Sequence, residues 1–373
     1  MQPTGGYYIG LMSGTSLDGI DAVLVNLNLQ PIQLLASSTH PIPTELKETL
    51  LRLTLPGDNE IELLGIADVQ FSRLQADIVD ALLQQSGIAP SQVHAIGSHG
   101  QTVRHRPEGA TPFSLQIGDP NTLAERTGIS VVADFRRRDL AAGGQGAPLV
   151  PAFHAALFSH DKLDRVVVNI GGMANITLLP KGRRMPVIGY DTGPGNILID
   201  SWISRNHQQD YDPLGAWARS GHIDPQLLSK LLQLDYFEQA PPKSTGREQF
   251  NLNWLDQQLA SVDHSISATD IQTTLTELTA CSIANEILKH NLARAEIYIC
   301  GGGAHNAYLL ERLSYHLQPL ILTATDALGL PADWVEACAF AWLAKRCLEK
   351  RPGNLATVTG AQAERILGGI YHA

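Results

Sequence analysis

The chain has 373 residues, and 37 acidic against 27 basic side chains give a formal net charge of −10. An acidic chain lacks the basic face that nucleic acids and anionic membranes require, so we expect neither as a partner. Four widely spaced cysteines without a CxxC pair, and no run of 18 apolar residues, favour a cytoplasmic protein without a disulfide framework, zinc site or membrane span.

The first part of the chain is predicted to open with a β-hairpin. Two apolar runs flank the segment Ser-Gly-Thr-Ser-Leu-Asp-Gly, and an Asp-Gly pair between such runs is a hairpin signal. A long helix and two further strands are predicted to follow. These elements cover residues 7–12 and 20–27 (hairpin), 60–85 (helix), 93–97 and 129–133 (strands).

A second hairpin is predicted about 155 residues later, where a strand, a Gly-Gly turn and a return strand recur. Two similar openings suggest two related α/β domains, and glycines and prolines near 141–151 place the junction there. We therefore predict domains 1–142 and 143–373. The second domain is predicted to contain strands at 165–170, 176–179, 186–190 and 296–300, and helices at 197–206, 270–290, from about 306, and at 333–350.

Three glycine turns follow predicted strands: 13–19, 191–196 and 301–303. Glycine exposes backbone N–H groups and permits close approach, so such turns can hold phosphate, especially where one leads into a helix. Each turn alone is better explained as a tight connection, because glycine is the default turn residue. Three of them favour a nucleotide held between the domains. The chain contains neither GxxxxGK[ST] nor a GxGxxG after a strand, so P-loop and dinucleotide folds are unsupported.

This organisation resembles the sugar kinase, actin and heat-shock ATPase superfamily. The resemblance implies an α/β fold of two related ribonuclease-H-like domains of the actin/hexokinase type with an interdomain cleft. At the residue level the chain is similar to the anhydro-N-acetylmuramic acid kinase family over essentially its whole length. The motifs that carry the similarity are 10–19 (GLMSGTSLDG), 97–102 (GSHGQT), 134–139 (DFRRRD), 143–151 (GGQGAPLVP), 169–172 (NIGG), 191–196 (DTGPGN), 242–248 (PKSTGRE) and 301–303 (GGG).

The resemblance implies a double reaction in cell-wall recycling. ATP, with Mg²⁺, phosphorylates O6 of 1,6-anhydro-N-acetylmuramic acid while water opens the anhydro bridge at C1, giving N-acetylmuramic acid 6-phosphate and ADP. It also implies a homodimer. The residues that it assigns to ATP are Gly14, Thr15, Ser16, Leu17, Asp18, Gly19, Ile20, Asp21, Gly171, Gly172, Gly193, Gly195, Asn196, Gly301, Gly302 and Gly303. Asp18 is expected to position Mg²⁺ through water, although Asp-Gly also simply makes hairpins.

The chemistry needs a base for the attacking water. Asp191 is the candidate, because it ends an apolar strand and opens a glycine turn; capping of that turn and Mg²⁺ ligation through water are the alternatives. The resemblance implies that Glu336 is a second carboxylate near the sugar, where it would help to position the water or Asp191; two close carboxylates would raise the pKa of one of them. The spacing of Glu336 from Asp333 is equally that of a helix capping box.

The sugar carries a lactyl carboxylate, for which a guanidinium is the natural partner. Arg136 is assigned to it, with Asp134 as an acceptor for a sugar hydroxyl, whereas Arg137 and Arg138 are expected to be surface residues. His99, Gln101 and Thr102 are predicted to form a polar sugar-binding loop after the strand 93–97. Lys243, Ser244 and Arg247 have no assigned role beyond contacts on domain closure.

Two other functions remain open from the residues alone. Another hexose kinase would use Asp191 to deprotonate a hydroxyl group instead of water. A nucleotide-binding regulator or filament protein on the same fold would have no sugar chemistry. Turnover in ¹⁸O water separates these readings, because only opening of the anhydro bridge puts the label at C1.

Overall fold

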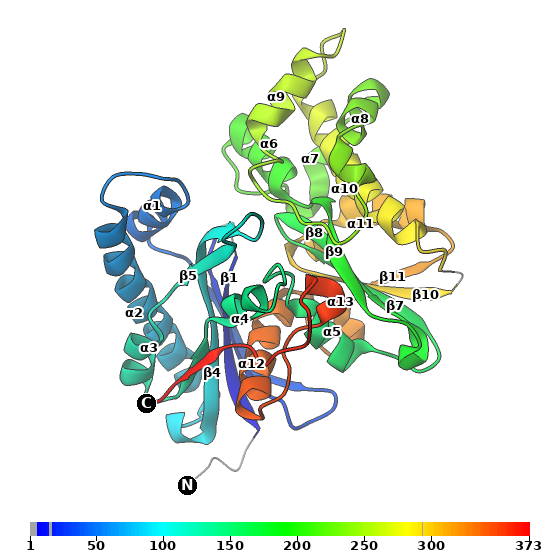
Figure 1. Ribbon diagram of the computed structural model, residues 1–373. Helices are drawn as coiled ribbons and strands as arrows, with labels where there is room; N and C mark the ends of the chain where they lie inside the picture. The colour runs from blue at the N-terminus through cyan, green and yellow to red at the C-terminus, as the bar shows by residue number, and fades with distance from the viewer. Residues whose placement is uncertain (1–5, 15–16, 293) are drawn as a thin grey trace. The chain divides into compact units, whose positions relative to one another are not determined.

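The computed structural model describes residues 6–14, 17–292 and 294–373, which form two compact units (Figure 1). The first unit comprises Met1–Leu157, Leu328–Leu330 and Trp334–Ala373; the second comprises Phe158–Ala327 and Pro331–Asp333. The predicted division at 142/143 differs from these units in two places. The chain crosses to the second unit later than predicted, and its last segment returns to the first.

A mixed sheet of seven strands forms the first unit, in the order β12-β6-β4-β1-β2-β3 with β5 paired to β4. Strands β1, β2 and β3 are antiparallel neighbours, whereas β1, β4 and β6 are parallel. The strands are β1 Tyr7–Ser13, β2 Ile20–Asn26, β3 Gln33–His40, β4 Val93–Arg106, β5 Phe113–Ile117, β6 Val131–Ala133 and β12 Gly369–Tyr371.

Side chains on β1 alternate between the two faces of this sheet, as strand geometry requires. Ile9 and Leu11 belong to the apolar core that the sheet forms with its covering helices. Gly10 faces the opposite side, where a Cβ atom would run into the carbonyl oxygen of Ala337 on α12 (Val335–Leu348). Gly97 on β4 meets the carbonyl of Phe340 in the same way. These two glycines let the last long helix lie directly on the sheet, which places it in the first unit.

Besides α12, the first unit contains further helices, of which α2 alone was predicted, at 60–85. They are α1 Thr44–Leu53, α2 Glu60–Ser86, α3 Pro120–Thr127, α4 Phe135–Ala141, α5 Val150–Phe158, which ends at the boundary between the units, and α13 Ala356–Thr359. Among the described residues, no helix combines the length and the apolar character needed to cross a membrane.

The second unit repeats the strand order of the first. Its five-stranded sheet runs β11-β10-β7-β8-β9, with β7, β8 and β9 antiparallel and β7, β10 and β11 parallel. The hairpin-opened repeat predicted from the sequence is thereby confirmed, because β9-β8-β7-β10-β11 corresponds to β3-β2-β1-β4-β6. The strands are β7 Asp164–Ile170, β8 Met173–Leu179, β9 Ile188–Pro194, β10 Ala295–Cys300 and β11 Ile321–Ala324.

Helix α10 (Ala268–Leu288) is the central helix of the second unit. Leu275 and Leu278 pack in one apolar cluster, whereas Ile283 and Ile287 pack in another, which α10 forms with the sheet next to β8 and β9. The side of α10 between these contacts carries buried threonines, so the helix is covered all round. The remaining helices are α6 Ile197–His207, α7 Ala216–Arg219, α8 Pro225–Leu232, α9 Leu252–Ala260 and α11 Ala307–Leu317.

Candidate functional site

The first glycine turn joins β1 to β2, and buried side chains hold its beginning. The hydroxyl of Ser13 lies 2.6 Å from Oε1 of Gln101 and 3.0 Å from the carbonyl oxygen of Gly19. Gln101 Nε2 donates to the carbonyl of Gly14 at 3.2 Å. The residues that the sequence assigned to a sugar-binding loop, 99–102, are in fact part of β4, and Gln101 supports the turn from the neighbouring strand.

The remaining residues predicted for this turn divide into core and surface. Leu17 and Ile20 are buried, whereas Asp18 is exposed. Asp21 lies on β2 and accepts a hydrogen bond from the hydroxyl of Thr39 at 2.6 Å. Thr15 and Ser16 lie outside the described residues.

His99 connects this turn to Arg136. Its Nδ1 lies 3.2 Å from the carbonyl oxygen of Ser13, and Arg136 donates to its Nε2 from Nε at 3.1 Å and from Nη2 at 2.9 Å. The pattern assigns the proton to Nδ1. Burial, with the adjacent Arg136, holds the pKa of His99 well below its usual value, so the ring is neutral at pH 7. Both ring nitrogens are thus occupied, and His99 supports Arg136 instead of offering a polar atom of its own.

Arg136 retains its positive charge for a ligand. Its Nη1 donates to the carbonyl of Gly146 at 2.8 Å, and its Nε and Nη2 donate to the neutral ring of His99. Burial lowers the pKa of Arg136 to about 10, and the charges of Glu336 and Asp139 counter part of that effect. A guanidinium with this pKa is protonated at pH 7. A partly buried cation held by neutral acceptors is suited to bind an anion.

Asp134 and Thr102 lie on β6-α4 and β4 of the same unit. Asp134 adopts a left-handed backbone conformation (φ 60°) and accepts hydrogen bonds from Arg137, with the shortest contact at 2.6 Å. The hydroxyl of Thr102 accepts from Nε2 of Gln116 at 3.1 Å. Arg137 and Arg138 are exposed, as predicted. The ion pair with Arg137 was not predicted, and it leaves Asp134 only part of its acceptor capacity.

Glu336 lies in the first turn of α12 and is partly buried. The capping box considered as an alternative is absent, because the N-cap is Trp334 and makes no side-chain cap bond. Asp333 instead pairs with Nε2 of His305 at 2.8 Å, within the second unit. Glu336 acts electrostatically on Arg136, whose protonated form it favours.

In the second unit, the turn of the β7-β8 hairpin is joined to the start of α6 by backbone hydrogen bonds. The N–H groups of Gly195 and Ile197 donate to the carbonyl of Gly172 at 2.9 and 3.1 Å, and Asn196 N–H donates to that of Gly171 at 2.8 Å. Of the N–H groups that the sequence offered to a phosphate at the start of α6, those of Gly195, Asn196 and Ile197 are therefore occupied. The turn 191–196 acts here as a support for the Gly171-Gly172 turn.

The predicted ATP glycines of this unit differ in the space around them. A Cβ at Gly172 would meet nothing within 4 Å, and one at Gly302 would meet only the amide nitrogen of Asn196 at 4.0 Å. Gly193, Gly195, Gly301 and Gly303 instead pack closely against other residues of the unit. Gly172 and Gly302 are thus the positions where a ligand can approach the backbone.

Asn169, at the end of β7, was missed as a candidate site residue. Its Oδ1 atom is buried without a hydrogen-bond partner, and the side chain is only 6% exposed. It lies directly behind Gly301, where an added Cβ would collide with Oδ1. Buried polar atoms are rarely left unpaired. The sequence signal that could have identified Asn169 is its place as a polar residue at the end of an apolar strand, next to a Gly-Gly turn.

Asp191 lies within β9, opposite Asn175, and is partly buried. Thr245 N–H donates to its Oδ2 at 3.1 Å, and Tyr236 OH donates to its main-chain carbonyl at 2.7 Å. Burial raises the pKa of Asp191 to about 7; the bond from Thr245 opposes this shift, and the charge of Glu248 adds to it. A carboxylate with this pKa is a competent base near neutral pH.

Thr245 and Glu248, which both act on the Asp191 carboxylate, come from the segment 242–248, for which only contacts on domain closure were expected. The carboxylate that helps to raise the pKa of Asp191 is Glu248. That effect was expected from Glu336, which belongs to the other unit. The motif at 242–248 marks the segment as part of the family pattern. Nothing in its local sequence predicts that it packs against β9.

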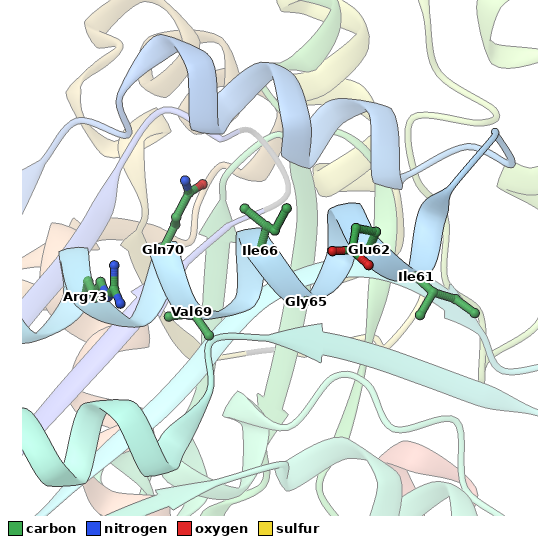
Figure 2. A pocket seen from close by; sticks show the side chains of 7 residues that line it. All are labelled: Ile61, Glu62, Gly65, Ile66, Val69, Gln70 and Arg73. Carbon is green, nitrogen blue, oxygen red and sulfur yellow. The ribbon is translucent and has the colours of Figure 1, made fainter.

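An open hollow of about 410 Å³ lies elsewhere, along one face of α2 (Figure 2). Its lining residues all come from that helix: Ile61, Glu62, Gly65, Ile66, Val69, Gln70 and Arg73. Ile61 is 89% exposed. None of the candidate catalytic or binding residues lines it, so the hollow is not the chemical site.

Comparison with known proteins agrees with this architecture. Component A of (R)-2-hydroxyglutaryl-CoA dehydratase from Acidaminococcus fermentans has the same fold, with a TM-score of 0.50, 10% identity, and coverage of 90% of this chain and 96% of that one. The two hairpin-opened units with the same strand order define an α/β protein of the actin/hexokinase type, built from two ribonuclease-H-like units.

Comparison of sequences identifies the family to which the chain belongs within this fold class. The family model for anhydro-N-acetylmuramic acid kinase matches residues 6–373. The proteins of that name from Coxiella burnetii (strain Dugway 5J108-111) and Shewanella oneidensis are 50% and 54% identical to this chain. Both alignments cover 98% of it, and they cover 97% and 99% of the relatives. The chain belongs to the anhydro-N-acetylmuramic acid kinase family and is a phosphotransferase.

Proposed function

We propose that this chain transfers the γ-phosphoryl group of ATP to O6 of 1,6-anhydro-N-acetylmuramic acid and opens the anhydro bridge with water. The observation that carries the proposal is Asp191, a partly buried carboxylate with a pKa of about 7. Asp191 takes a proton from the water that attacks C1. The C1–O6 bond breaks, O6 takes the phosphoryl group, and ADP leaves. The product is N-acetylmuramic acid 6-phosphate, as cell-wall recycling requires.

Arg136 is proposed to bind the lactyl carboxylate, with the carbonyl of Gly146 and the ring of His99 orienting its guanidinium. This assignment rests on the charge that Arg136 keeps for an anion. Thr102 and Asp134 retain acceptor capacity for sugar hydroxyls, whereas Gln101 and His99 act by supporting the first turn and Arg136. Glu336 favours the charged form of Arg136.

The open glycines Gly172 and Gly302 are the proposed points of closest approach for ATP in the second unit, and the backbone of 14–21 is the proposed contact in the first. Mg²⁺ prefers oxygen donors. The exposed carboxylate of Asp18 in the first unit is of that type, and so is the unpartnered Oδ1 of Asn169 in the second, so each is a candidate donor to the ion. When bound, Mg²⁺ neutralises phosphate charge during phosphoryl transfer.

The decisive experiment is turnover with ATP and the anhydro sugar in ¹⁸O water. One ¹⁸O atom at C1 of the phosphorylated product is expected. Phosphorylation without label at C1 would identify an ordinary hexose kinase, and binding of ATP without sugar phosphorylation would identify a regulator or filament protein. The variant Asp191→Asn is expected to bind both substrates and to lose turnover by at least about 100-fold, which is the low end for a general base. Substantial residual turnover would remove Asp191 from this role.

Two further properties follow from family resemblance. We propose that the enzyme acts in the cytoplasm, where its substrates ATP and recycled sugar meet, and that it is a homodimer. Analytical ultracentrifugation of the purified chain tests the second statement, with a single species of about 81 kDa expected from twice the chain mass of 40.4 kDa.

A further inference from the structure

A buried ion pair lies behind Asp191 that the reaction itself does not use. Nζ of Lys243 lies 2.8 Å from Oε1 of Glu286, and the two side chains are 2% and 3% exposed. Burial alone would raise the pKa of Glu286, but hydrogen bonds from Lys243 and Lys289 bring it below its usual value. Glu286 is therefore ionised. A buried pair of this kind adds little stability over an apolar pair, so its presence calls for another reason.

Each residue of the ion pair is connected to Asp191 or to its neighbour in β9 by hydrogen bonds. On the Lys243 side, the carbonyl of Lys243 accepts from Asp191 N–H at 3.2 Å, and Thr245 N–H, two residues on, donates to the Asp191 carboxylate at 3.1 Å. On the Glu286 side, Oε2 accepts from the hydroxyl of Tyr190 at 3.1 Å, next to Asp191 on β9. Glu286 thus binds both β9, through Tyr190, and the segment 243–245, through Lys243.

A second set of contacts closes the same network. Nζ of Lys243 lies 3.2 Å from the carbonyl oxygen of Tyr236, and the hydroxyl of Tyr236 donates to the carbonyl of Asp191 at 2.7 Å. Nζ also lies 4.8 Å from the centre of the Tyr236 ring. The titratable groups around Asp191 and the pair are Glu248, Tyr190, Tyr236, Lys289 and His290.

We propose that Lys243 and Glu286 are positioning residues for Asp191. Their ion pair holds the segment 243–245 against β9, so that Thr245 N–H stays on the Asp191 carboxylate and directs its free oxygen. This role rests on the proposed function only in naming Asp191 as the base. The placement of the carboxylate by the pair is measurable without turnover.

The test compares Lys243→Met, Glu286→Gln and the double variant Lys243→Met/Glu286→Gln. The titration of Asp191 is followed by NMR of protein labelled with ¹³C at aspartate carboxyl groups, and the spectrum of Asp191→Asn identifies its signal. Loss of the bond from Thr245 removes support for the ionised form, so the pKa of Asp191 is expected to rise by about one unit. Misplacement of the base is expected to lower kcat about 10- to 100-fold at pH 7, with KM for both substrates within about twofold.

Glu277→Gln is the matched control. Glu277 is a buried carboxylate on the same helix, 4% exposed and paired with Arg312 at 2.7 Å. It lies nine residues from Glu286, or about 13 Å along the helix axis. Glu277→Gln leaves the partly buried Arg312 without its partner, much as Glu286→Gln leaves Lys243, and the pKa of Asp191 and kcat are expected to stay at wild-type values.

Each outcome decides one question. An unchanged pKa of Asp191 and unchanged kcat in folded Lys243→Met overturn the proposal, as does an equal change in Glu277→Gln. The double variant leaves no unpaired buried charge, so its failure to fold would also overturn the proposal and make the pair a requirement for folding. If Asp191→Asn retains turnover, Asp191 is not the general base. The positioning role of Lys243 and Glu286 is then judged from the NMR titration of Asp191 alone.

Discussion

The raised pKa of Asp191 has a consequence for stability that can be measured. An ordinary aspartate titrates near 3.8, whereas Asp191 titrates near 7 in the folded protein. The folded state therefore binds this proton more tightly than the unfolded state, and stability falls as pH rises from about 4 to about 7. At about 1.4 kcal/mol per unit, the shift amounts to about 4 kcal/mol of destabilisation, present in full above pH 7.

Asp191→Asn removes this penalty and keeps an oxygen that can accept from Thr245 N–H. The variant is expected to be more stable than the wild type at pH 8 by up to about 4 kcal/mol, and at pH 5 by only about 1.6 kcal/mol. Thermal unfolding followed by circular dichroism at the two pH values checks this, because a difference of 2 to 3 kcal/mol between them corresponds to several degrees in Tm.

Asp256→Asn provides the control for loss of one negative charge. Asp256 is exposed and pairs with Arg205 at 2.6 Å, so its replacement removes an attraction and should not raise Tm at pH 8. If Asp191→Asn gained the same Tm increment at pH 5 and pH 8, or lost stability at pH 8, the reasoning from the raised pKa would be refuted.

Three other changes have defined outcomes. Arg136→Ala should raise KM for the sugar at least about 10-fold with KM for ATP nearly unchanged, because a charged hydrogen bond is worth about 1.5–3 kcal/mol; steady-state kinetics with equal changes in both KM values would contradict this. Glu248→Gln removes a negative charge near the base, so the acid limb of the kcat profile should move to lower pH, and a move to higher pH would refute the assignment. Gly10→Ala should destabilise the protein by about 3 kcal/mol through collision with the carbonyl of Ala337, whereas Gly65→Ala, in open space within α2, should stabilise it by about 0.5–1 kcal/mol. Urea unfolding of both glycine variants measures this contrast, and equal effects would argue against close packing at Gly10.

Much of the fold was predictable because its signals are local. Apolar runs separated by glycine turns identified both hairpins, and the helical stripe beginning at Ile271 identified α10. The segment 99–102 was wrongly predicted as a loop, because Gly97, Gly100 and polar side chains interrupt the apolar pattern. Those polar side chains are buried and hydrogen-bonded across strands, which lets β4 continue to Arg106.

The candidate site was less predictable because it depends on contacts between distant segments. Asp191 was identified from its own position, but its partners Thr245 and Glu248 come from a segment more than 50 residues later, and Glu286 from a helix further on. The packing of α12 on Gly10 is likewise invisible in the sequence, since a glycine between apolar residues has many explanations.

The return of the chain to its first unit determines the order in which the protein can be completed during synthesis. The second unit is nearly continuous, from Phe158 to Ala327, and has all its strands before α12 leaves the ribosome. The face of β1 and β4 that carries Gly10 and Gly97 stays bare until α12 arrives. The unit that is translated first is therefore finished last, and a chain shortened before Trp334 would leave that apolar face open to aggregation.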